Sequence, residues 1–204
     1  EDLNEQVLVG PWSISFLAVG VIVGLLLFGD LPDQVSDAHL EQEASDAIDH
    51  GEALVAASRY ADLAARAETD AFRATWLLEQ ARVLISARER SGDPRGLQAH
   101  RDWRPPVEVL EEALPLAATS DVLHRIRLRL AATYVGDDRH DDARELLNAI
   151  LGDPSAGPEM WSNAVLTSVA TGLTADLAGA VEELASGRMA NNPDSLVAVL
   201  TLIG

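Results

Sequence analysis

The chain has 204 residues, of which 33 are acidic and 15 are basic, and its formal charge at pH 7 is −18. A surface this acidic repels nucleic acids, which bind proteins through clusters of basic residues, so we expect no nucleic-acid partner. The sequence contains no cysteine, which excludes disulfide bonds, thiol catalysis and thiolate metal sites.

An uncharged stretch from residue 7 to residue 29 dominates the N-terminal part of the sequence. The hydrocarbon core of a membrane requires about 20 apolar residues in a helix. Pro11 suits the first position of such a helix, and Trp12 suits the membrane interface, where aromatic side chains gather. We therefore predict a polar arm over 1–6 and an uncleaved transmembrane helix over 7–29. The alternative is a buried helix of a soluble core.

Two glycines lie four residues apart within the predicted transmembrane helix, at Gly20 and Gly24. Small residues at this spacing let the backbone of a second membrane helix approach closely. Ser13 and Leu17 continue roughly the same face of the helix. We predict that these four residues pack against a helix of a membrane protein complex. The alternative is chance, because glycine is common in membrane helices.

The flanks of the predicted anchor carry no basic residue, since the first one in the chain is Arg59. The positive-inside rule therefore gives no orientation for this helix. A short N-terminal arm followed by a large domain favours a cytoplasmic N-terminus. We predict a single-pass protein of the bacterial inner membrane whose helical domain lies on the periplasmic side.

The pattern of apolar residues becomes helical after a linker that we place at 30–36. No run of alternating β-branched residues indicates a strand, so we predict an all-α domain over 37–204. The clearest part runs from residue 121 to residue 154, where two amphipathic helices flank a break at 136–138. Two helices joined by such a tight turn form an antiparallel hairpin.

Further helices follow from the same periodicity, although their spacing is less regular. We predict a first pair over 40–57 and 60–67 with its turn near residues 58–60, a long helix over 72–90, a helix from 107 that Pro115 kinks or ends, a helix after Pro158, and later helices over 175–189 and 195–203. Each hairpin would bury the apolar face of its neighbour, as in an α-solenoid.

The hairpin over 121–154 resembles a tetratricopeptide repeat, a helical hairpin of about 34 residues with small and large apolar residues at fixed positions. The residues that carry this resemblance form the predicted repeat core: Leu130, Ala131, Tyr134, Ala143, Leu147 and Ile150. Together with the anchor and the linker, the hairpin is similar to the YfgM-type family of ancillary subunits of the bacterial Sec translocon. The resemblance implies a short α-solenoid behind one transmembrane helix, a protein-binding role and no catalytic motif.

Two groups of basic residues on this acidic chain are candidate contacts for a partner. The segment 91–106 interrupts the helical pattern, and it contains Arg95, Arg101, Trp103 and Arg104. Arg125 and Arg129 are four residues apart and so share one helix face. An exposed tryptophan among arginines is typical of a binding hot spot. The alternatives are that Trp103 packs against its own hairpin and that the arginines neutralise nearby carboxylates.

No sequence motif indicates a catalytic centre or a metal site. The chain contains no HExxH motif, Gly-rich phosphate loop, GxSxG elbow or EF-hand loop. His39 with Glu43, and Asp46 with His50, have the spacing of two ligands on one helix face, but zinc requires three or four. We therefore predict a protein that is not an enzyme and has no cofactor or metal.

These observations predict a membrane-anchored protein-interaction scaffold that is an accessory subunit of a larger membrane complex. The first alternative is a periplasmic chaperone-like tether beside the translocon. The second is a peripheral subunit of a photosynthetic or respiratory complex that docks a basic soluble partner. Residues 1–29 hold three acidic and no basic residues, so −15 of the charge lies on residues 30–204. Such a charge attracts basic proteins, but it also suits a salty habitat.

Overall fold

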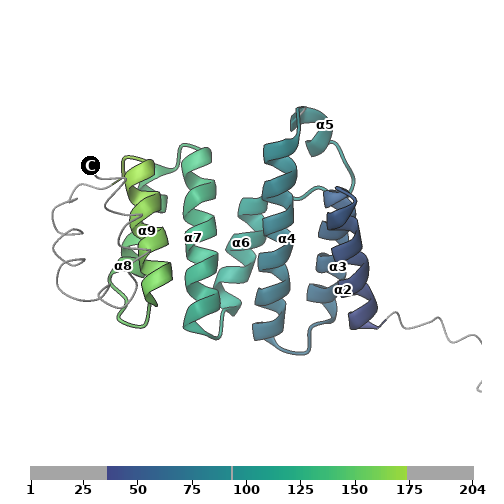
Figure 1. Cartoon of the computed structure of the whole chain (residues 1–204), viewed down its shortest axis with the longest axis horizontal. Helices are drawn as coiled ribbons and strands as arrows, with labels where there is room; N and C mark the ends of the chain where they lie inside the picture. The colour runs from purple at the N-terminus through teal and green to yellow at the C-terminus, as the bar shows by residue number, and fades with distance from the viewer. Residues whose placement is uncertain (1–35, 93, 174–204) are drawn as a thin grey trace, which may run out of the picture. The chain divides into compact units, whose positions relative to one another are not determined.

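The computed structural model describes residues 36–92 and 94–173, and these residues form an all-α structure (Figure 1). Eight α-helices in this part of the chain pack as adjacent pairs, which confirms the predicted all-α class. The helices are α2 (Asp37–Asp49), α3 (Ala53–Arg66), α4 (Asp70–Arg90), α5 (Pro94–Gln98), α6 (Pro106–Ala113), α7 (Ser120–Gly136), α8 (His140–Leu151) and α9 (Pro158–Ala170). A short 3₁₀ helix, η1 (Leu114–Leu116), follows α6.

The helices form two layers (Figure 1). In this view α2, α4, α7 and α9 lie in one row, and α3, α6 and α8 lie behind them. The two helices of each pair, α2–α3, α4–α6 and α7–α8, are in direct contact, and neighbouring pairs meet through α3–α4, α6–α7 and α8–α9. Each of the helices α3, α4, α6, α7 and α8 therefore packs against the helix before it and the helix after it in this series.

Several predicted elements lie outside the described residues. These are the arm 1–6, the anchor 7–29, which includes Trp12, Ser13, Leu17, Gly20 and Gly24, the linker 30–36 except for its last residue, and the helices predicted over 175–189 and 195–203. None of the helices described is both long and apolar enough to cross a membrane. The helices described above all belong to one compact unit.

The turn between α2 and α3 lies at residues 50–52, so the prediction of a turn near 58–60 is wrong. Gly51 adopts a left-handed backbone conformation, with φ of 77°. The N–H groups of Gly51 and Glu52 donate to carbonyls in the last turn of α2, at 3.0 Å and 2.7 Å. This pair of bonds is the helix ending that favours glycine, because other residues are strained at positive φ.

Threonine caps and a proline define other helix ends. Thr69 accepts a hydrogen bond from the backbone N–H of Phe72 at the start of α4 (3.3 Å). Thr119 accepts one from the N–H of Val122 at the start of α7 (3.4 Å). Each cap satisfies a donor that has no partner within its helix. The α-helix α6 ends before Pro115, as predicted, and the chain continues as η1.

The segment 91–106, predicted as a loop, is partly helical. Residues 94–98 form α5, and Pro106 already occupies the first turn of α6. Proline is tolerated there because the first N–H groups of a helix have no partner inside it. Residues 91–105 are therefore an insertion between α4 and α6, and α5 lies beside the C-terminal end of α4 (Figure 1).

The predicted repeat core comes from α7 and α8, which pack against each other. All six of its side chains are buried: Leu130, Ala131, Tyr134, Ala143, Leu147 and Ile150. The Tyr134 hydroxyl donates a hydrogen bond to Glu111 on α6 at 2.7 Å, and the Arg139 guanidinium lies 3.8 Å from the centre of the ring. Burial, together with the Glu111 carboxylate, raises the pKa of Tyr134 to about 12. The tyrosine hydroxyl therefore keeps its proton at neutral pH, and the side chain connects α7 to α6 and to the turn before α8.

We expect Ala143→Leu to destabilise the helical domain by about 1–3 kcal/mol, because Ala143 is fully buried and a packed core resists added methyl groups. Chemical denaturation of residues 37–204 measures this change. Ala132→Leu is the matched control, since Ala132 is exposed on α7, and it should change stability by less than about 0.5 kcal/mol. Equal stability of wild type and Ala143→Leu would show that α8 does not pack through this residue.

Candidate functional site

A groove of about 880 Å³ follows the row formed by α4, α7 and α9. Its lining comes from these three helices and from the turn between α8 and α9. The charged side chains of the lining are Glu79, Arg82, Asp121, Arg125, Arg129 and Glu159. Three are acidic and three are basic, so the groove is balanced in charge on a chain whose net charge is −18.

The middle wall of the groove is a stripe of charged residues on α7. Asp121, Arg125 and Arg129 follow one another at steps of four, which places them on one helix face. The Arg125 Nε lies 3.0 Å from the Asp121 carboxylate, and both side chains are exposed, so solvent weakens this pair. Arg129 forms no ion pair with the described residues and can meet a partner carboxylate. The structure therefore places both predicted arginines of α7 in the groove.

The outer walls contain residues that the sequence did not single out. On α4, Glu79 and Arg82 form an ion pair of 2.7 Å. On α9, Glu159 and Asn163 line the opposite wall. The only sequence signal for these walls is that α4 and α9, like α7, are first helices of predicted pairs, and these helices lie in one row (Figure 1).

A buried histidine connects the groove to the turn between α8 and α9. His124 is 1% exposed, and its Nε2 lies 3.1 Å from a carboxylate oxygen of Asp153. Because an ionised carboxylate only accepts hydrogen bonds, Nε2 carries the proton. The other oxygen of Asp153 accepts hydrogen bonds from the N–H and the hydroxyl of Ser155, each at 2.8 Å. Since Ser155 lines the groove, this network holds the turn in place there.

The protonation of His124 depends on this environment. Burial lowers the pKa of His124, and the Asp153 carboxylate offsets only part of this effect. A histidine in the unfolded chain has a pKa of about 6.5. Between that value and the lower pKa of the folded state, the unfolded chain binds more protons. The contribution of His124 to stability is therefore complete above about pH 6.5 and declines as the pH falls.

We expect the melting temperature of residues 37–204 to fall when the pH is lowered from about 7.5 to about 5. The fall should be smaller in His124→Gln, because a glutamine amide stays neutral over this range and can still donate to Asp153. Thermal unfolding followed by circular dichroism at both pH values measures the difference. His140→Gln is the control, since His140 is exposed, and it should retain the wild-type fall. An equal fall in wild type and His124→Gln would contradict the assigned role of this histidine.

The other predicted contact residues lie on the insertion 91–105, away from the groove lining. Arg95 and Arg101 are exposed, whereas Trp103 is half-buried. The backbone N–H of Trp103 donates to the carbonyl of His100 at 3.1 Å, within the turn that follows α5. The structure thus divides the six predicted contact residues between two sites, with Arg125 and Arg129 in the groove and the other four on the insertion.

Arg104 attaches the insertion to the helices beside it. Its guanidinium donates to the Glu112 carboxylate at 3.0 Å, and Arg73 on α4 donates to the other oxygen at 2.6 Å. Burial acts to raise the pKa of Glu112, but the hydrogen bonds from the two arginines outweigh it and lower this pKa. Glu112 therefore remains ionised and connects α4, α6 and the insertion.

The histidine pairs of α2 form local contacts. His39 and Glu43 are 3.1 Å apart, and His50 lies 2.7 Å from the backbone carbonyl of Asp46 rather than from its carboxylate. Within residues 36–92 and 94–173, no three His, Asp or Glu side chains are grouped closely enough to hold a metal ion.

Comparisons of the chain with protein-family models, curated proteins and solved structures found no match. The function of the groove is therefore inferred from its own side chains. These offer paired charges, one arginine that has no ionic partner among the described residues, and the amide of Asn163.

Proposed function

We propose that this chain is a non-catalytic, membrane-anchored scaffold that binds other proteins as an accessory subunit of a larger membrane complex. The groove along α4, α7 and α9 is the observation that supports this proposal. Its mixed charges suit a segment of a partner protein, which would bind through charge pairs and hydrogen bonds. In this proposal the helix over 7–29 anchors the protein in the inner membrane, and the helical domain is periplasmic.

We also propose that the pairs α2–α3, α4–α6 and α7–α8 are tetratricopeptide-like hairpins of a short α-solenoid, with α9 as the start of another. The contacts within and between successive pairs support this interpretation. Stacked hairpins present their first helices along one extended binding surface, and the groove lies on these helices. The resemblance to YfgM-type subunits supports the alternative of a chaperone-like tether, in which the same groove holds transient clients.

We expect Arg129→Glu to weaken binding of the partner to the full chain by at least about tenfold. The substitution adds an acidic side chain to the groove, which repels the partner carboxylate that the arginine attracts. Co-purification from membranes in mild detergent, followed by native electrophoresis, measures the bound fraction. Arg101→Glu is the matched control, because Arg101 is also exposed and unpaired among the described residues but lies on the insertion.

The pattern of co-migration separates the two candidate roles. A subunit migrates with one complex at a fixed stoichiometry, whereas a chaperone-like tether spreads over several species. Loss of the partner in Arg101→Glu but not in Arg129→Glu would place the contact on the insertion and contradict the proposed role of the groove.

A further inference from the structure

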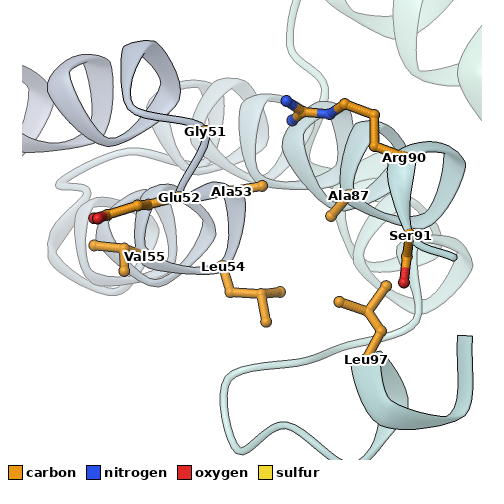
Figure 2. A pocket seen from close by; sticks show the side chains of 9 residues that line it. All are labelled: Gly51, Glu52, Ala53, Leu54, Val55, Ala87, Arg90, Ser91 and Leu97. Carbon is orange, nitrogen blue, oxygen red and sulfur yellow. The ribbon is translucent and has the colours of Figure 1, made fainter. Parts of the chain in front are cut away.

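A second hollow, of about 370 Å³, lies between the start of α3, the end of α4 and α5 (Figure 2). We call it the α5 pocket, and its lining includes Leu54, Val55, Ala87 and Leu97, with Glu52 and Arg90 at the edge. Figure 2 shows Leu54 and Leu97 extending toward each other from α3 and α5. A concave, mostly apolar surface with a few polar groups at its edge has the composition of a binding site.

An exposed phenylalanine elsewhere on the molecule matches this pocket in size and polarity. Among the described residues, two large apolar side chains are exposed: Val55 at 44% and Phe72 at 61%. Val55 belongs to the α5 pocket, and Phe72 lies in the first turn of α4, at the end of the helix that is opposite to the pocket. A cavity of about 150 Å³ holds a benzene ring, so the α5 pocket has room for the Phe72 ring.

The pocket is acidic on its α3 side, at Glu52, and basic on its α4 side, at Arg90, so only the α4 side complements the carboxylates that precede the ring. Glu68 and Asp70 are exposed and precede Phe72 by four and two residues. Arg90 stands at the α4 side of the pocket, where Figure 2 shows its guanidinium extending away from the apolar lining. Its Nε donates to the carbonyl of Ser86 at 3.1 Å, and it forms no ion pair with the described residues. An apolar ring preceded by carboxylates therefore fits this pocket when its carboxylates lie toward Arg90 and away from Glu52.

We propose that the α5 pocket binds Phe72 of a second copy of this chain, with Glu68 and Asp70 of that copy near Arg90. The inserted ring and the receiving pocket lie at opposite ends of α4, which spans 21 residues or about 30 Å. The contact is therefore heterologous, because each copy gives Phe72 to one neighbour and receives Phe72 from another. Copies of the chain associate head to tail, and each added copy presents a further groove.

Cysteine cross-linking tests this contact in membranes, because the full chain has no cysteine of its own. Copies with Ala71→Cys, which keeps the neighbouring Phe72 ring, and copies with Val55→Cys are produced together and oxidised. We expect a mixed disulfide dimer that neither variant forms alone. Ala65→Cys replaces Ala71→Cys in the control, since Ala65 is exposed near the same end of the helices. Because Phe72 is present in both variants, absence of the mixed dimer, or an equal yield with Ala65→Cys, would overturn the proposal.

Complementation between two variants tests the direction of the contact. Phe72→Ser removes the inserted ring, and Leu97→Glu places a charge in the α5 pocket. We expect each variant alone to self-associate at least about tenfold more weakly than wild type in sedimentation of the full chain in detergent. Their mixture should form one-to-one pairs, because Phe72 of the Leu97→Glu copy can still enter the intact pocket of the Phe72→Ser copy. These pairs should grow no further, since no other contact of this kind remains. Wild-type association of Phe72→Ser, or a mixture that does not pair, would contradict head-to-tail contact.

A charge exchange provides a variant that leaves the apolar lining intact. Arg90→Glu should weaken self-association, because the new carboxylate repels Asp70 of the second copy. Mixing Arg90→Glu with Asp70→Arg should restore pairing, since the attraction is then reversed in sign. If Arg90→Glu associates as wild type does, the proposed orientation of Phe72 in the pocket is wrong.

Discussion

Trp161→Ala is expected to lower the free energy of unfolding of the helical domain by about 3–5 kcal/mol. Trp161 is 1% exposed and is one of the largest fully buried side chains among the described residues. It lies on α9, which packs against α8 and α7, and removal of a fully buried indole leaves a cavity in the core. Denaturant unfolding of residues 37–204 measures the loss.

Two further tryptophan variants calibrate this result. Trp161→Phe keeps an aromatic ring in the core and should cost less than the alanine variant. Trp103→Ala should also cost less, because Trp103 is only half-buried on the insertion. If Trp161→Ala is as stable as wild type, α9 does not belong to the cooperative core, and the groove wall that it forms is not rigid.

The helices were predicted accurately where the residues of their buried and exposed faces differ strongly in polarity. The helices α7 and α8 combine large apolar and charged residues, so their period is clear, and the break near Gly136 separates them as predicted. The turn at Gly51 was missed because alanine dominates the residues after it, and alanine contrasts weakly with either face of a helix. The decisive feature there is a left-handed backbone at one glycine, which is a local property that periodicity does not report.

The candidate site could be predicted only where its residues share one helix. Arg125 and Arg129 could be grouped because a spacing of four fixes a common face. Glu79 and Glu159 come from α4 and α9, and their approach to α7 depends on how the helix pairs stack. The contact between His124 and Asp153 likewise depends on tertiary packing, since it joins α7 to the turn after α8.

Replacement of both Gly20 and Gly24 by leucine is expected to remove the protein from its membrane complex. Leucine keeps the predicted transmembrane helix apolar, so the chain should remain in the membrane fraction, but its side chain prevents close approach of a second helix backbone. Ala18→Leu adds the same bulk on the opposite side of the predicted helix, and it should leave the complex intact in native electrophoresis. If the double variant co-purifies unchanged, these glycines provide no packing contact, and the association with the complex must then arise elsewhere, with the groove and the insertion as the remaining candidates.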